Sequence, residues 1–140
     1  MRLLFAFAAG FLFAGGLSAQ TDDDAIRAMV KKYMDARESQ DAAAVGSLFT
    51  ADADQLVSSG VWRKGREELV KGTLASSRTA TGKRTITLTS IRYVAPGVAI
   101  ADGPYELGER KMWTCFVMVK GDRGWKISAI RNMLPAAPAQ

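Results

Sequence analysis

The clearest pattern of hydrophobic and polar positions lies in residues 111–120 and 125–133. Both runs are rich in β-branched, aromatic and sulfur-containing residues, and the Lys-Gly-Asp-Arg-Gly sequence between them is typical of a turn. They therefore predict an antiparallel hairpin. Side-chain alternation puts one set of residues on each face of its first strand: Met112, Thr114, Phe116 and Met118 on one, and Trp113, Cys115, Val117 and Val119 on the other. Both faces are largely apolar, so we expect the hairpin to be covered on both sides.

The N-terminal half shows helical spacing instead. Apolar residues recur at helical intervals over 23–40, after a run of three aspartates suited to capping a helix. Asp41 is expected to cap a second helix over 42–49, and a third is expected over 66–77. Strands are expected over 54–59, 84–94 and 98–107, with a loop over 60–65.

This order of elements predicts the fold class. Helices followed by a meander of four antiparallel strands indicate an α+β fold, in which N-terminal helices pack in a strongly curved, mainly antiparallel sheet. A cone of this kind has one open end, and we expect a pocket there.

The first residues have the pattern of an export signal. Arg2 precedes an apolar run, and small residues lead to an expected cleavage site after Ala19, which gives a signal peptide over 1–19. A domain over 20–134 and a disordered tail over 135–140 would remain. The alternative is a retained membrane anchor, but the run is short for a span of about 20 residues. We expect a periplasmic or secreted protein with no stable membrane insertion.

Composition excludes several classes of function. The formal net charge is +5, but the basic residues come as scattered pairs, which are typical of solvated surface: Lys31 and Lys32, Arg63 and Lys64, Lys83 and Arg84, Arg110 and Lys111. No nucleic-acid partner is therefore expected. The chain has no histidine, which removes Ser-His-Asp and Cys-His catalysis and histidine-based zinc sites. The single cysteine, Cys115, fits a small buried hydrophobe. We expect neither metal nor cofactor.

Several local motifs resemble one known superfamily. These are Asp41 before a short helix ending in Leu48 and Phe49, the Ala-Asp-Ala sequence at 51–53, Gly65 before a helix, and Gly-Trp-Lys-Ile at 124–127. Together they resemble the nuclear transport factor 2-like (NTF2-like) superfamily, and within it the SnoaL-like and DUF4440 groups. The resemblance implies a cone-shaped fold and leaves the activity open, because this fold hosts many functions.

The resemblance also permits a comparison with the ketosteroid isomerases of this superfamily. Tyr33 falls where those enzymes carry an oxyanion-hole tyrosine, but Val57 and Thr114 fall where they carry carboxylates. Their mechanism needs a carboxylate to move the proton, so it is excluded for this chain.

The candidate ligand pocket combines residues from several expected elements. Arg131 shares strand parity with core residues and is expected to anchor a carboxylate, although it has the alternative of pairing with Asp52 or Asp54. Tyr33 could alternatively be a core residue whose hydroxyl has only a structural partner, and Trp62 could alternatively cover the core instead of lining the pocket. The full set is Tyr33, Gln55, Val57, Trp62, Tyr105, Thr114, Phe116 and Arg131.

Two functions remain open. The first is an exported domain that binds a small hydrophobic or acidic molecule in a hydrophobic pocket without turnover. The second is a cofactor-independent enzyme of the cyclase or isomerase type, which would need Asp54, Asp102 or Glu106 inside the pocket as a base. Trp113, on the opposite sheet face, indicates a homodimer through the sheet.

Overall fold

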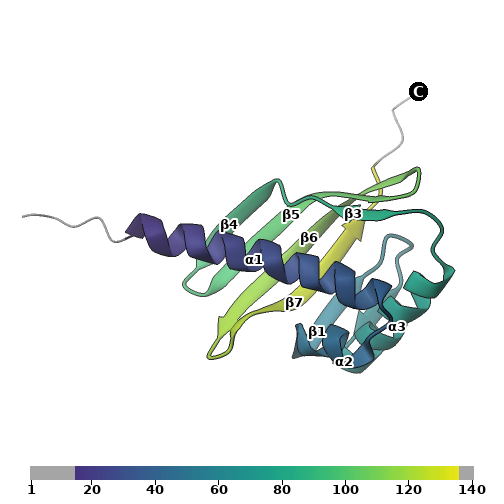
Figure 1. The fold of residues 1–140 in the computed structure, drawn as a ribbon, viewed down its shortest axis with the longest axis horizontal. Helices are drawn as coiled ribbons and strands as arrows, with labels where there is room; N and C mark the ends of the chain where they lie inside the picture. The colour runs from purple at the N-terminus through teal and green to yellow at the C-terminus, as the bar shows by residue number, and fades with distance from the viewer. Residues whose placement is uncertain (1–14, 136–140) are drawn as a thin grey trace, which may run out of the picture.

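The computed structural model describes the backbone of residues 15–135 and the side chains from residue 21 onward (Figure 1). The predicted signal peptide lies outside the described residues up to residue 14, and so does the predicted tail from residue 136. The elements are α1 Gly15–Glu38, α2 Ala42–Ser47, β1 Phe49–Leu56, β2 Trp62–Lys64, α3 Arg66–Thr79, β3 Arg84–Ile86, β4 Ser90–Ala95, β5 Val98–Leu107, β6 Arg110–Gly121 and β7 Gly124–Met133.

All the strands belong to one mixed sheet. Its order is β2-β1-β7-β6-β5-β3, and β4 pairs with β5 beside β3. Only β1 and β7 pair in parallel, and the other pairs are antiparallel. Helix α1 crosses one face of the sheet, while α2 and α3 gather near its C-terminal end (Figure 1). The expected α+β class with a mainly antiparallel sheet is therefore confirmed.

The main core lies between α1 and the covered face of the sheet. Ile26, Val30 and Tyr33 recur at helical spacing on α1 and are at most 2% exposed. The Tyr33 ring meets Phe49 of β1 and Phe116 of β6 edge-on, with ring centroids 5.7 Å and 6.1 Å apart. This contact fixes the turn of α1 that carries Tyr33 against the centre of the sheet.

Helix α1 begins earlier than the sequence pattern predicts. It starts at Gly15, so the three aspartates lie inside the helix and do not cap it. Two of them instead bind side chains of the sheet. Asp22 accepts hydrogen bonds from Lys120 Nζ at 2.7 Å and from Trp125 Nε1 at 3.0 Å, and Asp23 accepts one from Tyr93 at 2.6 Å. The predicted cap of α2 is confirmed, because Asp41 Oδ1 accepts from the backbone N–H of Ala44 at 2.9 Å.

Three differences from the predicted strands affect the site. The expected loop over 60–65 contains β2, and the single strand expected over 84–94 is divided into β3 and β4. In the final hairpin, Val117 pairs with Ala129 while Met118 pairs with Ile127, which leaves Ser128 as an extra residue in a β-bulge. Beyond the bulge, Ile130 and Asn132 are buried in addition to Ala129, whereas Arg131 is only half-buried, so the alternation has moved by one residue.

Candidate functional site

A cavity of about 390 Å³ opens where the C-terminal end of α1, helix α3, β2 and β3 meet the end of the sheet. Four arginines line it: Arg37, Arg63, Arg84 and Arg110. Gln55, Tyr105 and Asn132 add polar groups, and Val57, Leu107 and Met112 add apolar surface. No carboxylate is among the described lining residues. The lining is therefore basic and polar, in contrast to the hydrophobic pocket expected from the sequence.

Arg37 is a deeply buried residue of this lining. It follows Tyr33 by one turn on the buried face of α1 and is only 4% exposed. Its guanidinium donates to three neutral oxygens: Ser77 Oγ at 2.9 Å, the Tyr33 hydroxyl at 3.1 Å and Ser76 Oγ at 3.1 Å. No carboxylate in the described part of the chain pairs with it. Because a guanidinium has five N–H groups, these bonds leave two for a further acceptor.

Arg63 enters the cavity from β2. Its Nη1 donates to Oε1 of Gln55, its partner on β1, at 3.0 Å, and Gln55 is only 2% exposed. Burial lowers the pKa of the Arg63 guanidinium from its ordinary value, and the nearby positive charge of Arg37 also lowers it. The side chain stays protonated near neutral pH, because an arginine pKa starts far above that range. Arg37 and Arg63 are thus two like charges that line the same cavity and repel each other.

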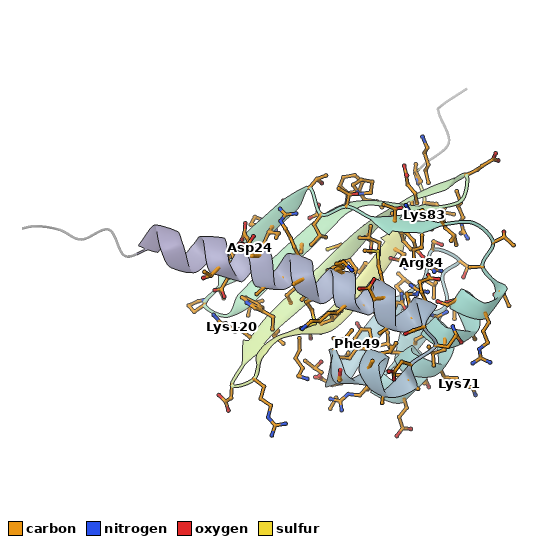
Figure 2. All side chains as sticks on the ribbon, viewed as in Figure 1. Asp24, Phe49, Lys71, Lys83, Arg84 and Lys120 are labelled. Atoms are coloured by element: carbon orange, nitrogen blue, oxygen red, sulfur yellow. The ribbon has the colours of Figure 1, made fainter. Side chains whose placement is uncertain are left out.

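Arg84 and Arg110 complete the basic wall. Figure 2 shows Arg84 beside the C-terminal end of α1, where it pairs with Glu38 and its Nε donates to the Tyr105 hydroxyl at 2.9 Å. Burial alone would lower the pKa of Arg84, but the Tyr105 hydrogen bond and the Glu38 charge outweigh it and raise that pKa. Arg110 is exposed at the mouth, where Nη2 donates to Ser58 Oγ at 2.8 Å. Among the described residues, only Arg84 of the four forms an ion pair with a carboxylate.

The predicted pocket residues fall into four groups. Gln55, Val57 and Tyr105 line the cavity. Tyr33 and Thr114 are buried behind it, and each binds a lining residue: Tyr33 accepts from Arg37, and Thr114 Oγ1 donates to Asn132 Oδ1 at 2.8 Å. Phe116 is a fully buried core residue. Trp62 and Arg131 lie outside the cavity.

The expected inward orientation of Arg131 is wrong. The bulge at Ser128 moves Asn132 into the inward position and places Arg131 opposite Cys115, on the other face. There Arg131 Nη1 donates to Asp54 Oδ1 at 2.8 Å, which is the alternative pairing considered from the sequence. The guanidinium also stacks over the ring of Trp62, 4.8 Å from its centroid, and Trp62 is 46% exposed.

Sequence reasoning missed all four lining arginines. Three of them belong to the basic pairs that we assigned to solvated surface, and in each pair the lysine is exposed while the arginine lines the cavity. Strand alternation contains the missing signal. Arg110 lies two positions before the buried Met112, and Arg84 two positions before the buried Ile86, so each shares a sheet face with a core residue. Arg63 lies opposite the buried Gln55 on the neighbouring strand. Arg37 continues the buried stripe of α1.

The carboxylates that an enzymatic mechanism would need do not reach the cavity. Asp54 pairs with Arg131, Glu106 is exposed and Asp102 is half-buried, and none of the three lines the cavity. Within residues 21–135, no three acidic or cysteine side chains lie close enough together to hold a metal ion. None of the helices in the same part of the chain has the length and apolar character required to span a bilayer.

Comparison with known proteins adds a family match. A model of the family described as "Putative lumazine-binding" matches residues 21–130. This match covers α1 from residue 21 onward and almost the whole sheet. No curated protein sequence matches the chain.

Solved structures share the fold. They include a domain of unknown function with a cystatin-like fold from Nostoc punctiforme (TM-score 0.71, 23% identity, 84% of this chain and 80% of that one). A ketosteroid isomerase-like protein from Erwinia carotovora atroseptica gives a TM-score of 0.65 at 17% identity, over 81% of this chain and 96% of that one. An NTF-2 like protein of unknown function from Shewanella oneidensis gives a TM-score of 0.65 at 17% identity, over 79% of this chain and 98% of that one. The expected NTF2-like fold is confirmed, and at these identities the likeness extends to the fold alone.

Proposed function

This chain belongs to the family described as "Putative lumazine-binding", whose model matches residues 21–130, and we propose that it binds a small organic anion in its basic cavity. One observation carries the proposal. Four arginines from distant parts of the chain converge on a single cavity, and three of them have no carboxylate partner among the described residues. A ligand carboxylate, or another oxyanion, is the group that would complement them.

The energetics of charge burial support an anion over a neutral ligand. A buried charge without a counterion costs several kcal/mol unless other groups compensate it. Arg37 is compensated by neutral hydroxyls and by the ring of Tyr33, whose centroid lies 5.2 Å from Arg37 Cζ, and each of these contributes less than an ionised acceptor would. Binding an anion would supply the counterion that the fold itself does not provide, so affinity would come mainly from charge.

The rest of the lining indicates the kind of molecule that carries the anionic group. Val57, Leu107 and Met112 provide apolar surface, and Tyr105 and Asn132 provide hydrogen-bonding groups. A cavity of about 390 Å³ fits a ligand of one or two rings. The name of the family points to lumazine, a flat heteroaromatic dione, and we propose aromatic or heteroaromatic acids of similar size.

A binding role is better supported than the enzymatic alternative. A cyclase or isomerase acting without a cofactor needs a group that accepts a proton, and the described lining offers arginines, amides and hydroxyls. Arginine does not act as a base near neutral pH because it stays protonated. Tight anion binding without turnover is therefore the proposal.

A thermal-shift screen with matched pairs tests this function. Benzoate and 2-naphthoate would be compared with their neutral carboxamides, with lumazine as a further ligand, against wild type, Arg63→Gln and Arg131→Gln. The acids should stabilise wild type and Arg131→Gln more than the carboxamides do, and Arg63→Gln should lose most of this preference. Equal shifts from acids and carboxamides, or no shift from either, would contradict anion binding.

We also retain the proposals of export and of a homodimer through the sheet. The first rests on the N-terminal sequence pattern, and a mature N-terminus at Gln20 in the exported fraction would support it. The second rests on Trp113 and Met133, which pair across β6 and β7 and are 42% and 43% exposed. Light scattering that gives a monomer at micromolar concentration would exclude the dimer.

A further inference from the structure

Gly72, in the middle of α3, faces the side chain of Arg63. A Cβ at this position would lie 2.2 Å from Arg63 Nε, 2.6 Å from Cδ and 2.7 Å from Cζ. Such distances are shorter than any non-bonded contact allows. The hydrogen atom of Gly72 therefore leaves a notch in the helix surface, and the arginine crosses α3 through this notch to reach the cavity.

Glycine is otherwise a poor choice at this position. In a helix interior it costs about 0.5–1 kcal/mol relative to alanine. No unusual backbone angle requires it, because Gly72 is not among the glycines with positive φ. The atoms that a Cβ would meet belong to the outer part of a flexible side chain, so alanine would displace Arg63 and leave the backbone in place.

Arg63 and Arg37 are suited to act together. Arg37 comes from α1 and Arg63 from β2, both line the cavity, and each donates only to neutral oxygens: Arg37 to three hydroxyls and Arg63 to Gln55. Two neighbouring guanidiniums that repel each other are a suitable environment for one carboxylate between them, because its charge offsets both.

We infer that Arg37 and Arg63 form a single subsite for one carboxylate of the ligand, and that Gly72 is the residue that admits Arg63 to it. The inference rests on the proposed function and deepens it. Arg84 and Arg110, on the remaining wall, are outside this subsite. The subsite is therefore sensitive to a substitution in α3 that touches no ligand.

Titration of benzoate, 2-naphthoate and their carboxamides tests this inference with wild type, Gly72→Ala, Arg63→Gln and the double variant. Gly72→Ala should stay folded, because the gain in helix stability from alanine offsets much of the loss of the Arg63–Gln55 hydrogen bond. Its affinity for the acids should fall about tenfold, as expected for the loss of a charge-assisted contact. The affinity of Arg63→Gln for the acids should fall by a similar factor. The affinity of the double variant should fall no further than that of either single variant.

Gly46→Ala is the matched control. Gly46 is also helical, and a Cβ there would meet only Val70 Cγ2 at 3.5 Å and Arg66 Cδ at 3.9 Å, so binding should not change. Wild-type affinity in Gly72→Ala, or fully additive losses in the double variant, would overturn the inference and leave anion binding intact. Failure of wild type to prefer the acids would overturn the proposed function itself, and the subsite with it.

Discussion

Arg131 Nη1 lies 2.8 Å from Asp54 Oδ1, and this ion pair joins the two parallel strands β7 and β1 outside the cavity. Both side chains are about one-third exposed, at 33% and 34%. Partly exposed pairs of this kind contribute little, because water already solvates both charges and salt screens them.

Replacement of Arg131 by alanine should therefore have a small effect. We expect the free energy of unfolding to fall by about 0.5–1 kcal/mol, since a partly exposed pair and a stacked ring are lost. Affinity for benzoate should stay the same, because the side chain is outside the cavity. Urea denaturation and titration of the same variant measure both quantities, and a large loss of affinity would restore Arg131 as the anchor.

The Tyr33 hydroxyl should matter through Arg37. Phenylalanine at position 33 keeps the ring contacts with Phe49 and Phe116 but removes an acceptor from a guanidinium that is 4% exposed. We expect Tyr33→Phe to lower the free energy of unfolding by about 1–3 kcal/mol, the cost of an unsatisfied buried donor. Urea denaturation in a wild-type and an Arg37→Met background isolates this effect. The same loss in both backgrounds would show that the hydroxyl does not act through Arg37.

Asp22 should make the free energy of unfolding depend on pH. The hydrogen bond from Lys120 and then that from Trp125 hold the pKa of Asp22 below its ordinary value of 3.8. A carboxyl group whose pKa is lowered by folding stabilises the protein fully above pH 3.8. This contribution is lost as the pH falls through the lowered pKa. Wild type should therefore exceed Asp22→Asn in stability at neutral pH, with a gap that narrows in acid.

Asp24 provides the control for this pH dependence. It belongs to the same acidic run but is exposed (Figure 2). Urea denaturation of Asp24→Asn at neutral and acidic pH should give little difference from wild type at either. If the difference in free energy of unfolding between wild type and Asp22→Asn widened in acid, the assignment of the Asp22 carboxylate as a stabilising acceptor would be contradicted.

The sequence predicted the elements better than it predicted the site. Helical spacing and strand alternation are local signals, so α3, β5 and the final hairpin were expected close to their observed positions. The bulge at Ser128 has no local signal of this kind, because it depends on how β7 pairs with β6. One extra residue reverses the face of everything after it. For that reason Arg131 was expected inside, and Asn132 was missed.

The cavity depends on contacts between segments that are distant in the sequence. Arg37 and Arg110 are 73 positions apart by their residue numbers, and nothing local indicates that they share a cavity. Each basic pair taken alone resembles surface, because one of its residues does face solvent. Strand alternation, counted from a known core residue such as Met112, identifies which residue of a basic pair faces inward. This count is useful only once it is known toward which face the sheet curves.

Titration of wild-type protein with an aromatic carboxylate and its neutral carboxamide, each at low and high salt, tests the central claim most directly. The basic cavity predicts that 2-naphthoate binds at least about tenfold more tightly than its carboxamide, since a charge-assisted contact to arginine is lost. Salt should reduce this preference, because the mouth of the cavity is open to solvent. Equal affinity for the two compounds at low salt would contradict the claim that the four arginines form an anion site.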